Sequence, residues 1–389
     1  MKRGWLSGPQ GVLWIMAALG WTALGVGFAL DSRRALFSYL AAYVWSLSVA
    51  LGALCFLAIV NAMNATWPVA VRRLAEGMSA TLPLFAVLFA PLFLGLSSLY
   101  PWMTPEQFRD PHTHEIVMHR LAYYNVPFFA VRWVVVFVCW IALALAFRRW
   151  SLQQEGGKGE ALRRRICVAG VAGLIPLALT LSVAAFDWLM SLTPAWYSTV
   201  FGVYFFAGAF VGGIAALVVL AARLQGQGLL PELRGSHFHA LGRMLLAFTA
   251  FWGYIAFFQY MLIWIANRPA EGAWFVQRAA SPWRAMSVAL VLGQFVIPFV
   301  VLLSFRIKRS SRLLAPVAIW ILAFHYVDMY WLVMPAFASV GFRASWMDGA
   351  ALLAVGASAV LCGMWLLRGR ALLPVGDPAL ARALKYESR

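Results

Sequence analysis

The run from Ala35 to Ala62, ALFSYLAAYVWSLSVALGALCFLAIVNA, carries no charged side chain along its whole length. A helix rises 1.5 Å per residue, so about 20 apolar residues are enough to cross the hydrocarbon core of a bilayer. This stretch therefore predicts a transmembrane helix.

Apolar runs of similar length recur along the rest of the chain, which is 63% hydrophobic and only 12% charged. Soluble domains carry about 25% charged residues. The run lengths favour helices, because strands of a membrane barrel need only about 10 alternating residues each. The sequence predicts an all-α integral membrane protein that forms one polytopic domain over residues 1–389. The ten predicted spans lie near 9–30, 35–62, 78–99, 122–147, 167–192, 197–223, 240–267, 283–305, 313–335 and 347–367.

A formal net charge of +17 raises the question of a nucleic-acid partner, but the basic residues alternate between loops. One set of loops holds Lys2 and Arg3, Lys158, the run Arg163-Arg164-Arg165 and the group from Arg306 to Arg312. Cytoplasmic loops of membrane proteins are enriched in this way. We therefore expect lipids and no nucleic acid as partners, a bacterial inner membrane location and both termini in the cytoplasm.

Familiar ligand patterns for redox centres are missing from the sequence. Its cysteines, at positions 55, 139, 167 and 362, stand singly and form no Cys-x-x-Cys motif. An outer loop holds His112, His114, Glu115 and His119, which are metal-ligand types but are more often solvated. We expect no cofactor and no metal bound by this chain alone.

Two aspartates interrupt the predicted spans, and each is followed by a proline seven residues later. Asp187 lies in the fifth span, before Pro194, and Asp328 lies in the ninth, before Pro335. A carboxylate at the bilayer centre costs about 2.5–3.5 kcal/mol on insertion scales, so intramembrane charges are usually functional. The equal spacing suggests a duplicated design, with repeats near 35–192 and 197–335.

Two further ionisable residues lie at comparable predicted depths. His325 precedes Asp328 by one helical turn, and Arg132 lies in the fourth span. We predict that Asp187, His325, Asp328 and Arg132 converge in the outer half of the bundle and handle protons, with Arg132 tuning the pKa values of the others. The alternative is an ion pair between Arg132 and an aspartate that only holds helices together.

Several tyrosines are candidate quinone or relay contacts. Tyr197, Tyr326 and Tyr330 could donate hydrogen bonds to a quinone carbonyl, although tyrosines near span ends more often anchor the protein at the membrane interface. Tyr254, in the seventh span, could line a half-channel.

Small and polar residues in the sixth and seventh spans indicate helix contacts. Gly208 and Gly212 have the GxxxG spacing that permits close helix packing. Thr249 and Gln259 lie elsewhere around the seventh span from Tyr254, and interhelical hydrogen bonds are the simpler interpretation of them.

Five stretches carry a resemblance to a known family. The chain resembles ActF, a membrane protein of bacterial alternative complex III that is related to the NrfD and polysulfide-reductase membrane anchors, over roughly residues 100–340. The stretches are HRLAYYN from His119 to Asn125, FDWLMSL from Phe186 to Leu192, STVFGVYFFAG from Ser198 to Gly208, FTAFWGYIAFFQYMLIWIAN from Phe248 to Asn267 and FHYVDMYWLVMP from Phe324 to Pro335.

The resemblance implies ten helices, of which the second to fifth and the sixth to ninth form two four-helix bundles and two are peripheral. It implies a non-redox membrane component of a quinol:cytochrome c or other quinol:electron-acceptor oxidoreductase, which contributes to proton movement and to assembly. The implied partners are a paralogous NrfD-like protein with the better-supported quinol site, an iron–sulfur protein, haem c proteins and a terminal oxidase. The quinol would be menaquinol or ubiquinol.

Two other classes of protein remain open from the sequence. A secondary transporter would enclose its substrate between duplicated halves, usually beside helices broken near the membrane midplane. A purely structural anchor would hold peripheral proteins and would use the buried charges only for packing.

Overall fold

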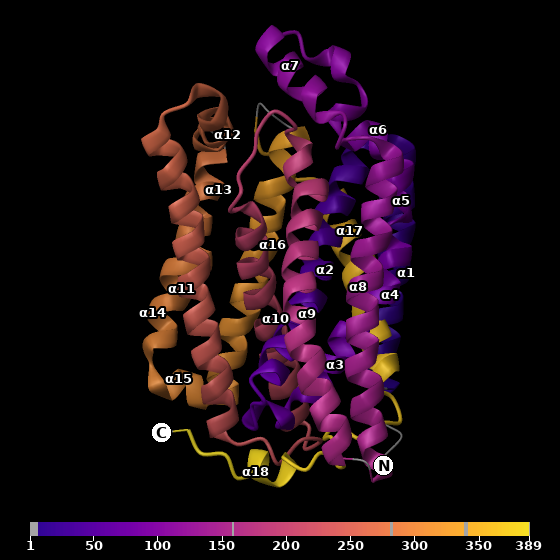
Figure 1. Cartoon of the computed structure of the whole chain (residues 1–389), viewed down its shortest axis with the longest axis vertical. Helices are drawn as coiled ribbons and strands as arrows, with labels where there is room; N and C mark the ends of the chain where they lie inside the picture. Colours follow the sequence, from indigo (N-terminus) through magenta and orange to yellow (C-terminus); the bar gives the residue numbers. More distant parts are fainter. Residues whose placement is uncertain (1–6, 158, 281–282, 338–340, 389) are drawn as a thin grey trace.

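The computed structural model of the chain describes residues 7–157, 159–280, 283–337 and 341–388, which form helices and no strand (Figure 1). Lys2, Arg3 and Lys158 lie outside the described residues. The α-helices are α1 Ser7–Leu30, α2 Ser32–Ala62, α3 Arg72–Ser79, α4 Leu82–Leu88, α5 Ala90–Leu94, α6 Leu96–Leu99, α7 Pro111–Arg120, α8 Val126–Gln153, α9 Gly159–Trp188, α10 Phe201–Gly226, α11 Gly235–Ala266, α12 Pro269–Ala279, α13 Trp283–Leu290, α14 Ile297–Leu303, α15 Phe305–Arg309, α16 Ser311–Phe337, α17 Trp346–Leu367 and α18 Leu380–Leu384.

Ten segments of the described chain are long and apolar enough to cross a membrane, and they coincide with the ten predicted spans. The chain is therefore an all-α, multi-pass integral membrane protein. The third segment begins at Arg72 and the fifth at Gly159, both earlier than predicted. The predicted spans begin after Arg72, Arg73 and Arg163, because these residues are charged. In the structure all three are buried within the helices.

The helices form two groups around a central pair. In the first bundle α2, α3, α4, α8 and α9 pack together, and in the second α10 and α11 pack with α13, α14 and α16. The central pair is α2 and α10, one from each bundle, while α1 and α17 pack together beside α2. The start of α1 and the C-terminal segment lie at the same end of the molecule, at the bottom of Figure 1.

The contact between α2 and α10 depends on residues without side-chain bulk. A Cβ added to Gly213 of α10 would lie 2.5 Å from the carbonyl carbon of Gly52 in α2, and one added to Gly52 would collide with the carbonyl oxygen of Ala209. Backbones can approach this closely only where side chains are absent or small. These residues therefore set the distance between the bundles.

Two spans predicted as continuous helices are interrupted. The third is divided into α3, α4, α5 and α6, and Pro83 and Pro91 lie at the starts of α4 and α5. The eighth contains a π-turn, Val291–Val296, directly before the Ile297-Pro298 start of α14. Proline has no N–H to donate to the preceding turn, which accounts for the interruption of regular helix at these points. The Trp320 indole N–H donates to the Gly293 oxygen of the π-turn at 2.8 Å.

The equal spacing from aspartate to proline does not produce equal helix ends. Helix α9 ends at Trp188, one residue after Asp187, so Pro194 lies beyond it. Pro335 lies inside α16, which continues to Phe337. The ninth predicted span, which stopped at residue 335, therefore ends two residues too early. Side chains of α12 support the carbonyls in that last turn, because Gln277 donates to the Pro335 oxygen at 2.9 Å.

Candidate functional site

Asp187 of the first bundle is held in a buried ion pair. The Arg132 Nε of α8 donates to Asp187 Oδ2 at 2.7 Å, and the two side chains are only 8% and 3% exposed. The guanidinium also donates to the Tyr123 carbonyl at 3.0 Å and lies 3.8 Å from the centre of the Tyr123 ring. The last turn of α9 thus places Asp187 against a cation that is itself fixed by α8 and the preceding loop.

Asp328 of the second bundle has neutral partners instead. The Tyr204 hydroxyl of α10 donates to Asp328 Oδ1 at 2.5 Å, and the Trp252 indole N–H of α11 donates to Oδ2 at 3.3 Å. Asp328 is fully buried, and no lysine or arginine of the described chain lies within ion-pair distance of it. This carboxyl of α16 is therefore hydrogen-bonded by side chains of two neighbouring helices, α10 and α11, without a countercharge.

His325 connects the two bundles. Its Nε2 lies 2.7 Å from Ser48 Oγ of α2, and the Ser48 hydroxyl donates to the Trp45 carbonyl at 2.7 Å. Because that hydroxyl has one proton, the geometry favours a histidine that donates from Nε2 and leaves Nδ1 as an acceptor. Nδ1 is buried and has no hydrogen-bond partner among the described residues.

The two glycines with GxxxG spacing make room for this imidazole. A Cβ at Gly212 would lie 2.7 Å from His325 Cδ2, and one at Gly208 would lie 3.2 Å from His325 Cε1. The same point beside Gly208 is 3.5 Å from His325 Nδ1 and 3.6 Å from Asp328 Oδ2. The unpartnered nitrogen and the carboxylate oxygen therefore approach one spot on the surface of α10.

The four predicted ionisable residues thus divide into two sites. Arg132 pairs with Asp187, and Asp328 lies with His325 at the Gly208 face of α10. No hydrogen bond or ion pair joins the two sites within the described part of the chain, so the single cluster expected from the sequence is not formed. The cause is that α9 and α16 belong to different bundles.

The candidate tyrosines occupy four different environments. The Tyr330 hydroxyl donates to Asp348 Oδ2 at 3.2 Å and accepts from Arg34 at 3.3 Å. Tyr197 is 46% exposed and lies under the Arg120 guanidinium, and Tyr254 is 58% exposed on the outer face of α11. The Tyr326 hydroxyl alone among the four is buried and unpartnered in the described structure.

Sequence analysis missed several buried polar groups of the second bundle. Gln294, in the π-turn, is 1% exposed, and neither its amide nitrogen nor its oxygen has a partner in the described residues. Arg278 of α12 is 2% exposed and lies between the rings of Trp274, at 3.4 Å, and Trp331, at 5.0 Å. Thr249 and Gln259 of α11 were noted in the sequence, where interhelical hydrogen bonds were the simpler interpretation, but both are buried and their side-chain oxygens have no hydrogen-bond partner in the described residues. The sequence offered one signal for Gln294, namely that an uncharged polar residue lies inside an otherwise apolar run.

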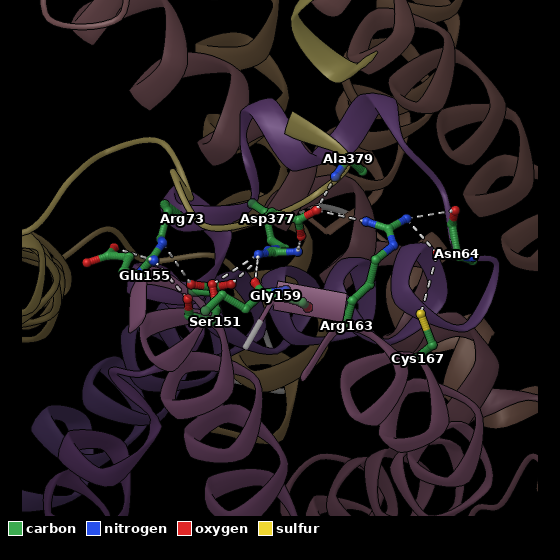
Figure 2. A network of polar contacts seen from close by, with 12 residues as sticks. Asn64, Arg73, Ser151, Glu155, Gly159, Arg163, Cys167, Asp377 and Ala379 are labelled. Carbon is green, nitrogen blue, oxygen red and sulfur yellow. Dashed lines mark hydrogen bonds and ion pairs between the residues drawn. The ribbon is translucent and has the colours of Figure 1, made fainter. Parts of the chain in front are cut away.

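A second polar network lies at the end of the molecule where α1 begins and α18 lies (Figure 2). Asp377, in the C-terminal strap defined here as residues 368–388, accepts from Arg72 at 2.5 Å, from Arg163 at 3.0 Å and from the Ala379 N–H at 2.7 Å. Burial alone would raise the pKa of Asp377, but the charges of Arg72 and Arg163 and the Ala379 hydrogen bond hold it below its ordinary value.

The strap also reaches the second bundle. His237 of α11 lies 2.9 Å from the Ala383 carbonyl, and His239 lies 2.5 Å from the Ser388 hydroxyl. Contacts on both bundles make the strap a tie across this end of the molecule. Its partners in α3, α9 and α11 lie more than 100 residues away in sequence, so no local pattern predicted the contacts.

The histidines of α7 do not assemble a metal site in the described structure. His119 Nε2 is 3.8 Å from Glu115, and both side chains are more than two-thirds exposed. No group of three or more His, Cys, Asp or Glu side chains that could hold a metal ion occurs among the described residues.

The fold and these sites define a class: a multi-pass helical membrane protein with ionisable side chains buried in both bundles. Comparison of the chain with protein-family models finds no match, and neither does comparison with curated proteins.

Proposed function

We propose that this chain is the proton-handling membrane component of a quinol:electron-acceptor oxidoreductase of the alternative complex III type. The resemblance of the five sequence stretches to ActF supports the assignment to that kind of complex. The buried ionisable residues support the role within it. The membrane would be the bacterial inner membrane, with both termini in the cytoplasm.

The observation that carries the proton-handling role is the pair formed by Asp328 and His325. Both residues are fully buried inside a membrane bundle, where an ionisable group is costly and usually functional. Asp328 has only neutral partners, so it can bind or release a proton without breaking an ion pair. His325 offers an unpartnered nitrogen toward the same point beside Gly208. We propose that a proton passes between them through one water molecule.

Asp187 has a different part in this account. Its ion pair with Arg132 joins α9 to α8. Removing one partner of a buried ion pair lowers the free energy of unfolding by several kcal/mol. We propose that this pair holds the first bundle together and is not the site of proton exchange. The alternative considered for both aspartates, an ion pair that locks helices, thus applies to Asp187 alone.

Electrons would be carried by the partner proteins that the resemblance implies, namely the iron–sulfur and haem c proteins, the paralogous NrfD-like protein and a terminal oxidase as acceptor. Within this chain the four cysteines are unpaired and three or more metal-ligand side chains do not gather among the described residues. If menaquinol or ubiquinol contacts this chain, Tyr326 is the one candidate tyrosine with a buried, uncommitted hydroxyl.

Two measurements test the proposal. Purification in a mild detergent should recover haem c and iron–sulfur proteins with this chain, whereas recovery of an isolated homodimer would rule out the complex.

Infrared difference spectra recorded during a pH titration should show a buried carboxyl band that disappears in Asp328→Asn and persists in the surface variant Asp110→Asn. A band unchanged in Asp328→Asn would overturn the proton-handling role.

A secondary transporter is the second candidate, because two spans are discontinuous. The interruptions fall in the third span and in the eighth. Transporter repeats place such breaks at corresponding positions of their two halves. In repeats of spans two to five and six to nine, the third span corresponds to the seventh, which is the unbroken helix α11. This mismatch favours the proton-handling proposal.

A further inference from the structure

A hollow opens on the outside of the first bundle, between α8 and α9. It measures about 480 Å³ and is lined by Trp150 of α8 and by Ala161, Arg164, Arg165, Val168 and Ala169 of α9. Helix α9 begins at the end of the molecule that carries the C-terminal strap (Figure 1). The hollow therefore lies near one surface of the membrane.

The run Arg163-Arg164-Arg165 is divided between two environments. Arg163 turns inward and binds Asp377, whereas Arg164 and Arg165 are exposed and form no ion pair within the described chain. Glu160, one turn before Arg164, is exposed and is not bonded to it in the described structure. Two uncompensated guanidinium groups thus line one concavity, and such groups match the geometry of phosphate oxygens.

An apolar strip continues from the arginines into the membrane. Val168, Val171 and Ile175 follow Arg164 at spacings of four, three and four residues, so all four lie on one face of α9. The three apolar side chains are 61%, 59% and 72% exposed. Trp150 flanks the charged end of the strip, at the level where tryptophans are enriched in membrane proteins.

From this arrangement we infer a binding site for an anionic phospholipid in the leaflet on the side of the C-terminal strap. The phosphodiester lies between Arg164 and Arg165, and an acyl chain lies along Val168, Val171 and Ile175. A free phosphate ion satisfies only the charged half of this site. The continuous apolar strip is the reason to assign a lipid. The site is independent of the proton-handling residues, which lie inside the bundles.

The test uses the full chain in phosphatidylcholine micelles, titrated with phosphatidylglycerol and examined by native mass spectrometry. In the double variant Arg164→Gln/Arg165→Gln, the affinity of this one site for phosphatidylglycerol should fall about 30-fold, because each arginine near an anionic lipid contributes roughly fivefold. At low lipid concentration the variant should therefore carry one phosphatidylglycerol fewer than the wild type. The matched control, Arg306→Gln/Arg312→Gln, removes two exposed charges from the same end of the second bundle and should keep the wild-type affinity.

Two outcomes would overturn the inference. Equal losses in both double variants would show that the attraction is a diffuse effect of charge. Wild-type binding in the Arg164/Arg165 variant would show that the hollow is not the site. Inorganic phosphate and Val171→Asn separate lipid from ion: phosphatidylglycerol binding should survive millimolar phosphate and should weaken in Val171→Asn. Displacement by phosphate, with Val171→Asn unaffected, would assign the site to a free anion.

Discussion

Asp187 and Asp328 have equal spacing to a proline in the sequence but opposite electrostatic surroundings in the structure. Asp187 shares its charge with Arg132, and Asp328 has only the Tyr204 hydroxyl and the Trp252 indole. The stability of the protein should therefore respond differently to the same substitution. Asp187→Asn leaves a buried cation without its partner and should lower the free energy of unfolding by about 3–5 kcal/mol. Asp328→Asn keeps an acceptor for Tyr204 and should cost about 1 kcal/mol.

Thermal unfolding in detergent measures both effects. A double variant, Asp187→Asn/Arg132→Gln, removes the unpaired cation and should recover most of the loss. Equal destabilisation by the two single variants would contradict the distinction between an ion-paired and a neutral site.

The glycines beside His325 make a second prediction at the scale of single residues. Gly212→Ala places a methyl group 2.7 Å from His325 Cδ2 and should destabilise the protein by about 1–3 kcal/mol, since crowding a packed site forces shifts. Gly208→Ala, with 3.2 Å to Cε1, should cost less. Adding His325→Ala should suppress the cost of Gly212→Ala in a double-mutant cycle. Full additivity would show that the imidazole is not what the glycine accommodates.

At this scale the sequence located the buried ionisable residues better than it indicated their partners. Asp187, Arg132, His325 and Asp328 stood out because charge is rare inside apolar runs. Tyr204 and Trp252 did not, because aromatic residues are common in such helices and only the packing of α10 and α11 against α16 brings them to Asp328.

Among the elements, the π-turn Val291–Val296 carries the clearest test. It turns the unpartnered amide of Gln294 into the second bundle. Gln294→Met keeps the shape and removes a buried polar group without partners, so it should leave stability unchanged or raise it by about 1 kcal/mol. If the amide belongs to the proton route, proton uptake should fall in the same variant. A stable variant with unchanged uptake would exclude Gln294 from that route.

The C-terminal strap should depend on pH through Asp377. The folded-state pKa of this carboxyl lies below its ordinary value, so its contribution is complete above about pH 4 and is lost as the pH falls through the folded-state pKa. Hydrogen exchange of residues 377–388, corrected for intrinsic rates, should show protection that is constant from pH 7 to about pH 4 and decreases below that.

Two variants separate the carboxyl from general effects of acid. Asp377→Asn should expose the strap already at neutral pH and remove the pH dependence. Glu387→Gln, an exposed carboxyl of the same strap, should behave as the wild type. A strap that stays protected in Asp377→Asn would show that the contacts of His237 and His239 are sufficient to hold it.

The spans could be predicted because length and hydrophobicity alone satisfy the requirement that backbone groups be hydrogen-bonded within lipid. Their interruptions could not. Pro83, Pro91 and Pro298 were visible in the sequence, but Pro176 lies inside α9 and Pro316 inside α16 without ending either helix, so a proline does not by itself predict an interruption.

Across the whole molecule, the sequence predicted an all-α multi-pass architecture correctly but placed its charges in one cluster. Which helices adjoin depends on the close contact of Gly52 with Ala209 and Gly213, a long-range match without a local pattern. That contact brings Ser48 of one bundle to His325 of the other. The two bundles are therefore in contact through the histidine. We expect a substitution at Asp328 to change the surroundings of Ser48 in α2 as well.

The most direct test of the proposed proton-handling role measures the protons released when the proposed complex oxidises quinol. The variant to use is Asp328→Asn, because it should fold and assemble. We expect the variant complex to keep all its component proteins and to release fewer protons per quinol. Asp110→Asn, which changes an exposed carboxyl at the start of α7, should behave as the wild type. Normal turnover and normal proton release in assembled Asp328→Asn would contradict the proton-handling role.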